Sequence, residues 1–311
     1  MFIVGGGHSW SVADNTTMTN APNRPLNLRE LALQALCEAN PTAKVNLVLE
    51  MREVDIFSLS IPNVTAGKLP GKPDRPELAH PAKVPRRSPT TLEGRAATMH
   101  AIAHIEFNAI NLALDVLWRF DDMPDAFYQD WALVAKEEAQ HFTLLREHLR
   151  GMETQADGAP RWDYGDFAAH DGLWEMCDKT AHDIVARMAL VPRTLEARGL
   201  DATPQIQAKL RQVATPDALS AVAILDIILR DEICHVAIGN HWYRWLCARD
   251  GFEPAAHCAA LTELYKAPRL RPPFNKAARL KAGFTADELR ALEASPQNER
   301  GNPSKCSATY E

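Results

Sequence analysis

The chain has 311 residues, a formal net charge of −6, and 46% hydrophobic against 24% charged residues. This composition predicts one large or two ordinary packed domains and excludes global disorder. The acidic balance argues against a broad nucleic-acid surface, although it leaves room for a local basic patch. No apolar run approaches the ~20 residues that a membrane span needs, so we expect no membrane contact.

Residues 1–26 predict a loose N-terminal extension. They lack the basic and apolar regions of a secretory signal, and no helical pattern follows their three consecutive glycines. The six cysteines of the chain form no CxxC pair. This spacing favours free, mostly buried thiols in a reducing compartment over disulfides or a cysteine zinc site. We therefore expect a cytoplasmic protein.

Residues 27–90 predict a helical segment and then an extended arm. A helix, a break at Asn40-Pro41 and a second short helix are expected within 27–52. The density of proline in 61–90 prevents a long helix. This stretch carries the apolar residues Leu69, Leu78 and Val84. We therefore favour an arm that wraps around a helical body rather than a mobile linker.

Apolar residues recur with a 3.6-residue period in the region 91–250, which predicts an all-α fold with a four-helix bundle. The four predicted helices span residues 92–119, 125–150, 171–199 and 216–248. Gly199 is expected to end the third of them. Residues 251–311 predict a C-terminal cap with short helices around 254–265 and 285–294, followed by a polar tail. Thr285 begins a capping box for the last helix.

Two copies of the motif Glu-x-x-His stand on the second and fourth predicted helices. Glu138 precedes His141 by three residues and Glu232 precedes His235 by three, so each pair shares one helix face. Both faces are apolar, and a buried carboxylate is unfavourable unless it is paired or bound to metal. Two independent buried Glu–His hydrogen bonds are the alternative. The recurrence of the motif 94 residues later favours metal binding.

The first and third predicted helices supply single carboxylates. Glu106 lies on an apolar face, and pairing with an arginine or histidine is its alternative role. On the third helix we choose Glu196, which lies 36 residues before Glu232, and keep Asp183 as the reserve ligand. Pro192, one turn before Glu196, predicts a kink or an opened carbonyl at this position.

The complete set is Glu, Glu-x-x-His, Glu, Glu-x-x-His, which in a four-helix bundle is the dimetal-carboxylate arrangement. Carboxylates and imidazoles without thiolate suit two iron ions, with manganese as the alternative. Glu137 and Asp231 are placed to accept the second N–H of the histidine in the opposite motif; otherwise they are ordinary surface acids. Arg187 and Arg193 are expected to pair with Asp183 or with helix carbonyls.

Six blocks between about residues 28 and 292 carry a family resemblance: PGKPDRPEL, VPRRSPTTLEGRAATMHAIAHIEFNAINLALD, FYQDWALVAKEEAQHFTLL, YGDFAAHDGLWEM, ARMALVPRTLEARGLD and ILRDEICHVAIGNHWYRWLC. Through them the chain resembles the ferritin-like superfamily and, more closely, the ferritin-like family designated domain of unknown function 455. The resemblance implies a ferritin-like fold and metal binding. It implies no established reaction.

Three functions follow as hypotheses. The first is a non-haem dimetal oxidoreductase that uses O₂ to oxidise or hydroxylate a small-molecule substrate. Hydroxylation of a modified tRNA nucleoside, as in a related ferritin-like group, is a variant that the acidic balance hardly supports. The second is metal storage or detoxification, although a minimal cage subunit lacks the extra terminal segments. The third is a scaffold with a vestigial site, although all ligand types are present. The assembly that we consider is a homodimer.

Overall fold

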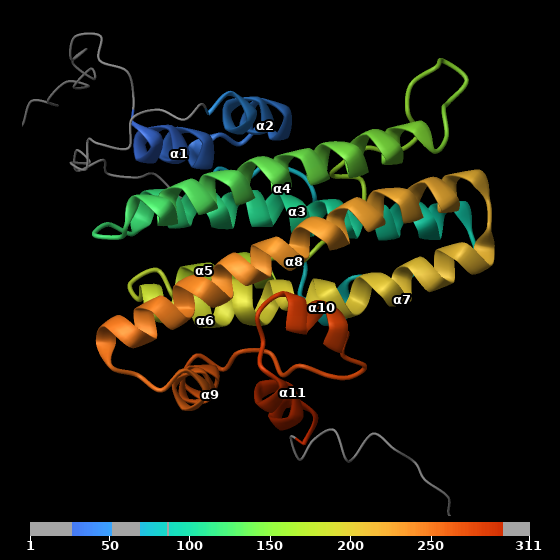
Figure 1. Ribbon diagram of the computed structural model, residues 1–311. Coiled ribbons are helices and arrows are strands. Elements are labelled where there is room, and N and C mark those ends of the chain that lie inside the picture. Colours follow the sequence, from blue (N-terminus) through green and yellow to red (C-terminus); the bar gives the residue numbers. More distant parts are fainter. Residues whose placement is uncertain (1–26, 52–68, 86, 295–311) are drawn as a thin grey trace, which may run out of the picture.

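The computed structural model describes residues 27–51, 69–85 and 87–294 (Figure 1). Over these residues the protein is all-α, as predicted, and its β pairing is limited to two isolated bridges. The predicted N-terminal extension and polar C-terminal tail lie outside the described residues, as does part of the proline-rich arm.

The N-terminal helical hairpin forms where the sequence predicts a helix, a break and a second helix. Helix α1 spans Leu28–Cys37 and begins with a capping box between Asn27 and Glu30. Helix α2 spans Pro41–Glu50, and the Asn40 side chain accepts hydrogen bonds from its first turn. The hairpin packs on α3 and α4 (Figure 1).

Residues 69–85 lie along this helical body and contain one short 3₁₀ turn, η1 (Pro81–Lys83). The Gly71 N–H donates to the Leu36 carbonyl over 2.8 Å, and the Ala79 N–H donates to the Ala169 carbonyl over 2.8 Å. Leu78 is 43% exposed. Backbone hydrogen bonds and the packing of the partly buried Leu69 on the main core therefore hold this part of the arm.

Three long helices coincide with predicted ones to within two residues: α3 (Leu92–Arg119), α4 (Asp125–Gly151) and α8 (Pro216–Asp250). The Thr91 side chain caps α3, and Gly251 ends α8 in the left-handed region at φ 77°. Helix α4 packs against both α3 and α8, so α4 lies at the centre of the group.

The third predicted helix is wrong in its extent. The chain forms instead α5 (Gly172–Lys179), α6 (Ile184–Leu190), a π-helical turn η2 (Val191–Glu196) and α7 (Ala197–Val213). Asp183 restarts the helix as the N-cap of α6, because its side chain accepts a hydrogen bond from the Ala186 N–H. Gly199 lies inside α7 and does not end it.

Two prolines interrupt this stretch without ending it. Pro192 lies in η2, so the distortion predicted there takes the form of a π turn that finishes at Glu196. Pro204 lies inside α7 and has no N–H to donate to the Leu200 carbonyl one turn earlier. The Asn275 side chain donates to that carbonyl instead, over 3.2 Å.

The C-terminal segment covers one side of the long helices. Its helices are α9 (Pro254–Leu264), α10 (Lys276–Lys281) and α11 (Ala286–Glu293). The capping box predicted at Thr285 is confirmed in α11. Helix α10 was not predicted, because six residues are too short to show a helical period. It packs on α7 and α8.

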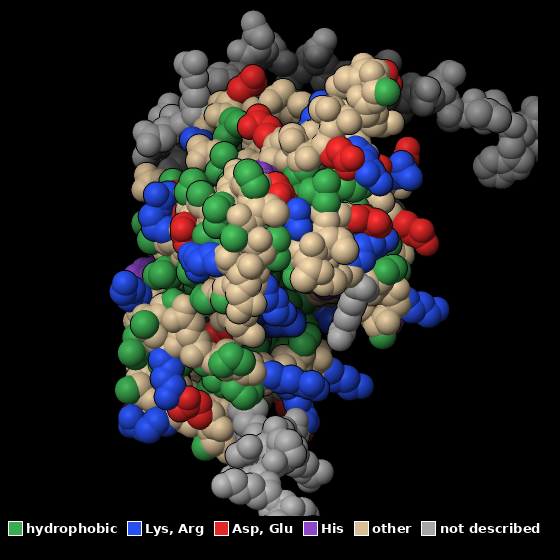
Figure 2. All heavy atoms as spheres, turned by 90° about the vertical axis from the view of Figure 1, so that its right-hand side faces the viewer, with side chains coloured by type: hydrophobic (Ala, Val, Ile, Leu, Met, Phe, Trp, Pro, Cys, Tyr) green, Lys and Arg blue, Asp and Glu red, His purple; other side chains and the backbone are tan. Residues whose placement is uncertain are grey.

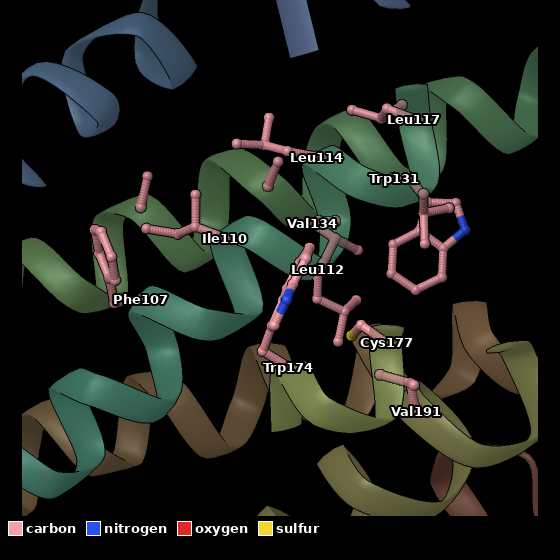
Figure 3. Packing of buried hydrophobic residues seen from close by; sticks show 14 of the residues in the cluster. Phe107, Ile110, Leu112, Leu114, Leu117, Trp131, Val134, Trp174, Cys177 and Val191 are labelled. Carbon is pink, nitrogen blue, oxygen red and sulfur yellow. The ribbon is translucent and has the colours of Figure 1, made fainter. Parts of the chain in front are cut away.

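The main core lies between α3, α4 and the α5–η2 stretch (Figure 3). Ile110 and Leu112 of α3, Val134 and Trp131 of α4, and Trp174 and Val191 of the α5–η2 stretch all belong to this core. A separate small cluster joins α10 to α7 and α8 and consists of Ala197, Leu200, Val236, Ala278 and Ala282. The C-terminal segment is thus packed on the helices that lead to and from Glu196 and His235.

Among the described residues, no helix is both long enough and apolar enough to cross a membrane. Acidic and basic side chains both occur over the face seen in Figure 2. The five described cysteines are free, as expected, but only Cys177 and Cys247 are buried. The expectation that the thiols are mostly buried is therefore wrong for the described cysteines.

Candidate metal centre

Two groups of carboxylates and imidazoles meet between α3, α4 and α8, and Glu138 belongs to both. One group contains Glu106, Glu138 and His141, and the other contains Glu138, Glu232 and His235. Within each group, one ligand atom from every residue lies within 4.8 Å of the others. All five side chains are buried. The helical i,i+3 spacing brings each glutamate beside its own histidine.

Glu138 lies between the two histidines. Its Oε2 atom is 3.3 Å from His141 Nδ1, and its Oε1 atom is 2.9 Å from His235 Nδ1. Glu106 Oε2 is 3.4 Å from His141 Nδ1, and Glu232 Oε1 is 3.9 Å from His235 Nδ1. Each imidazole therefore turns its Nδ1 atom toward a pair of carboxylates, one of which is shared.

The outward ring nitrogens contact the two acids that precede the glutamates. His141 Nε2 is 3.1 Å from Asp231 Oδ2, and His235 Nε2 is 2.7 Å from Glu137 Oε2. These are the crossed pairs predicted from the sequence. An Nε2–H that donates to a carboxylate leaves the Nδ1 lone pair facing the cluster, which is the orientation a metal ligand needs.

The two candidates on the third helical stretch are placed differently. Glu196 is buried at the end of η2, and neither of its carboxylate oxygens has a hydrogen-bond partner. It joins neither group of three, but the charges of Glu232 and Glu138 act on it. Asp183 is the half-buried N-cap of α6, 2.9 Å from the Ala186 nitrogen, and lies outside both groups. The charges of Glu232 and Glu138 thus act on Glu196, whereas the Asp183 carboxylate serves as a helix cap.

Burial and mutual repulsion shift the acid–base equilibria of the carboxyl groups. Burial, with the charge of Glu138, raises the pKa of Glu106 well above its ordinary value. Burial, with the charge of Glu232, does the same to the pKa of Glu196. The Glu232 pKa is also raised, by burial and by Glu138. These shifts favour the protonated form of each of the three carboxyl groups.

The pKa values of the two histidines are also raised, although burial acts against this shift. Burial alone would lower the pKa of His141, but hydrogen bonds to Glu106 and Glu138 outweigh burial and raise this pKa to about 11. The Glu138 charge likewise raises the His235 pKa well above its ordinary value against the effect of burial. Burial would raise the pKa of Glu138, but the two histidines outweigh it and hold this pKa below its usual range.

Unsatisfied polar atoms concentrate in this cluster. Fourteen buried side-chain atoms of the described residues lack a hydrogen bond of good geometry, and six of them belong to the predicted ligands. These six are Glu106 Oε2, Glu138 Oε1, Glu196 Oε1, Glu196 Oε2, Glu232 Oε2 and His235 Nδ1. Of these six, Glu138 Oε1 and His235 Nδ1 lie 2.9 Å apart as an ion pair, and Glu106 Oε2 lies 3.4 Å from His141 Nδ1. Buried polar groups are nearly always satisfied, so their concentration calls for a missing partner. Because the donors are carboxylate oxygens and imidazole nitrogens, they fit a pair of divalent cations.

The two arginines of this region have partners that the sequence did not indicate. Arg187 is fully buried and donates to Asp115 Oδ2 over 2.6 Å. Arg193 is buried in η2 and donates to Glu288 of α11. Neither side chain pairs with the Asp183 carboxylate, but Arg187 Nη2 donates to the Cys177 carbonyl of α5, so the expected pairing with a helix carbonyl is found for Arg187. Asp115 lies on the apolar α3 helix, which was a usable signal, whereas nothing local pointed to Glu288.

Comparisons with known proteins give a family but no function. The family model described as "Protein of unknown function (DUF455)" matches residues 37–290. The chain is also 46% identical over 272 residues to an "Uncharacterized protein" of Haemophilus influenzae, which covers 82% of this chain and 90% of that relative. No solved structure gives a significant match. All six predicted ligands lie within the residues that the family model matches.

Proposed function

This chain belongs to the DUF455 family, and from that premise we propose that it is a dimetal-carboxylate oxidoreductase of the ferritin-like type. It would bind two iron or manganese ions and use O₂ to oxidise or hydroxylate a small organic substrate. One observation carries the proposal: the buried Glu138 carboxylate lies between His141 Nδ1 and His235 Nδ1 and belongs to both ligand groups. A carboxylate shared in this way is suited to span two cations.

The helix arrangement supports the same assignment. In a ferritin-like bundle, two helices each carry Glu-x-x-His and the other two each carry a single glutamate. Here α4 and α8 carry the motifs, α3 carries Glu106, and the η2–α7 stretch carries Glu196. The four glutamates would neutralise two divalent cations.

The donor set favours iron or manganese over zinc. Carboxylates and imidazoles suit these metals, and zinc sites of structural type normally use thiolates. The Cys177 thiol interacts electrostatically with Glu196, but burial raises its pKa to about 12. It therefore stays protonated and is a poor ligand at neutral pH.

The chain would hold two cations with two overlapping sets of residues. Glu106, Glu138 and His141 form the first set; Glu138, Glu232 and His235 form the second, to which we assign Glu196 as well. The bound metals would supply one-electron redox chemistry with O₂. The protein would supply ligands and a buried environment, while Asp231 and Glu137 would hold the two imidazoles in the Nε2–H tautomer.

Metal analysis of protein purified without oxygen tests this function. We expect about two iron or manganese ions per chain, as the dimetal arrangement requires. Glu138→Ala should lose both, because it removes the ligand common to both sets. Glu147→Ala is the matched control, because Glu147 is an exposed residue of the same helix. A wild-type chain with less than about one ion, or an unaffected Glu138→Ala variant, would refute the proposal.

The assembly in solution tests the oxidoreductase part against storage. An enzyme should elute from size exclusion as a monomer or small oligomer and should consume O₂ only when a reductant is supplied. A closed cage of many copies that accumulates iron far beyond two ions per chain would favour storage instead.

A further inference from the structure

The C-terminal segment contacts the chain on both sides of Glu196. Three residues make these contacts: Arg279 of α10, Phe284 of the following turn and Glu288 of α11. We call them the C-terminal clamp. They lie more than 80 residues beyond Glu196 in the sequence, so their contacts with its neighbours are purely tertiary.

On the N-terminal side of Glu196, the clamp holds Arg193. This side chain is 5% exposed and lies within η2. Its Nη2 atom donates to Glu288 Oε1, and its guanidinium carbon lies 4.8 Å from the Phe284 ring centroid and 5.3 Å from that of Tyr243. A buried guanidinium with an ion pair and two aromatic faces has little freedom to move. The π turn is thereby fastened three residues before Glu196.

On the C-terminal side, the clamp holds the first turn of α7. Arg279 is fully buried, and its Nη2 atom donates to the Ala197 carbonyl over 3.2 Å and to Asp201 Oδ2 over 2.6 Å. Ala197 directly follows Glu196. The C-terminal segment therefore contacts the backbone on both sides of Glu196.

The clamp is itself held in place. The Thr285 N–H donates to Glu288 Oε2 over 2.8 Å in the capping box, and Arg244 of α8 donates to the same oxygen over 3.1 Å. Glu288 thus connects α11, α8 and η2 through one carboxylate. A rigid Glu288 can transmit the position of α8, which carries Glu232 and His235, to the π turn.

Glu196 needs such external support for a physical reason. Its two oxygens are buried without hydrogen-bond partners, beside other carboxylates that repel it. A side chain in this position gains by turning toward water unless the backbone prevents it. Pro192 in η2 has no N–H to donate to the preceding turn, so the backbone just before Glu196 has one hydrogen bond fewer.

We propose that the C-terminal clamp positions Glu196 as a ligand of the second metal ion, the one held with Glu232 and His235. Arg279, Phe284 and Glu288 are positioning residues, since they act on Glu196 through Arg193 and Ala197. The inference rests on the proposed function, because it concerns a ligand of the proposed dimetal centre. It predicts that damage to the clamp affects the two metal equivalents unequally.

Anaerobic titration of the full-length protein with Mn(II), with free Mn(II) counted by electron paramagnetic resonance, tests this inference. The variant Glu288→Gln keeps the size of the side chain and the capping box but removes the charge that holds Arg193. We expect one of the two Mn(II) equivalents to bind about tenfold to a hundredfold more weakly, as for other supporting residues of metal ligands. The other equivalent should be unchanged.

Asp287→Asn is the matched control. Asp287 precedes Glu288 in α11, is exposed and pairs only with Arg290 among the described residues. This variant should titrate like the wild type. Glu196→Gln should weaken the same equivalent as Glu288→Gln, and the double variant should lose no more than Glu196→Gln alone.

The outcomes separate the inference from the function on which it rests. If the wild type binds no Mn(II), the proposed function fails. If it binds two equivalents and Glu288→Gln binds both as tightly, the clamp proposal fails while the function stands. Equal weakening of both equivalents would also overturn the clamp proposal, because it indicates a general loss of folding rather than an effect on Glu196.

Discussion

Among single residues, the buried histidines show how environment decides charge. His141 and His235 lie against carboxylates, so their pKa values are raised. His100 is buried against the rings of Tyr164 and Phe167, where the charge of Asp163 does not outweigh the loss of water. Burial lowers its pKa to about 4. The same residue type is thus cationic in one layer of the protein and neutral in another.

His100 should make the protein sensitive to acid. Its pKa is about 4 in the folded protein against an ordinary value of 6.5. Between these two pH values, the imidazole is protonated in the unfolded chain but neutral in the folded chain. The contribution of His100 to the free energy of unfolding is therefore complete above pH 6.5 and is lost as the pH falls toward 4. We measure the free energy of unfolding of the metal-free protein in urea. Between roughly pH 7 and pH 4.5, the decrease in this free energy should be about 2–3 kcal/mol smaller for His100→Gln than for the wild type.

Glutamine at position 100 can still accept the 2.9 Å hydrogen bond that the Gly165 N–H donates to the His100 ring. His241→Gln is the control, because His241 is exposed on α8. It should keep the wild-type dependence on pH. An identical pH dependence of His100→Gln and wild type would show that His100 is not the neutral group described above.

Among the elements, η2 has the most unusual surroundings. Pro192 in this π turn packs against α8 at Gly239, where an added Cβ atom would lie 2.5 Å from Pro192 Cβ. Only glycine allows this approach. Gly239 lies one turn after His235, so the close contact joins the two backbone segments that carry Glu196 and His235. Contact of this kind fixes the distance between elements more firmly than flexible side chains do.

Gly239→Ala should therefore destabilise the protein although alanine favours helices. We expect a loss of about 1–3 kcal/mol in the free energy of unfolding, because the π turn must move to admit the methyl group. Gly199→Ala is the matched control, since Gly199 lies inside α7 with open space where its Cβ would stand. That variant should gain about 0.5–1 kcal/mol. Urea unfolding of both proteins decides, and a stabilised Gly239→Ala variant would contradict the packing described.

For the molecule as a whole, the buried charges of the cluster link folding to cation binding. When no cation is bound, the raised pKa values favour protons on Glu106, Glu196 and Glu232 and on the two histidines. Cations must displace these protons, so cation binding should strengthen as the pH rises. The formal charge of −6 includes the four inward-facing glutamates. Part of the acidic excess is therefore internal rather than on the surface.

Removal of metal should lower the stability of the whole protein. A ligand that binds only the folded state, at a free concentration about 1,000-fold above its dissociation constant, adds about 4 kcal/mol to the free energy of unfolding. We expect a chelator to lower the wild-type Tm by several degrees. Glu138→Ala should show no response to chelator, while Glu147→Ala should respond like the wild type. An unchanged wild-type Tm would contradict a structural contribution of the cations.

Much of this architecture follows from local sequence signals. Apolar periodicity and helix caps predict α3, α4 and α8 nearly to their ends, because both depend on residues within a few turns. The i,i+3 spacing predicts that Glu138 and His141 share a face, and the adjacent acids predict the crossed contacts with Asp231 and Glu137. These features are properties of single helices or of a repeated motif, so one sequence suffices to anticipate them.

Tertiary structure decided the rest. Asp183 and Glu196 both looked like ligands, but the chain restarts a helix at Asp183 and thereby uses its carboxylate as an N-cap. Arg193 finds its partner 95 residues later, at Glu288. No local pattern encodes such a contact, because it depends on how the C-terminal segment packs on α7 and α8. The sequence by itself therefore determined which helices form and which faces carry acids and histidines, whereas only the packing between distant segments decided how the third carboxylate is held.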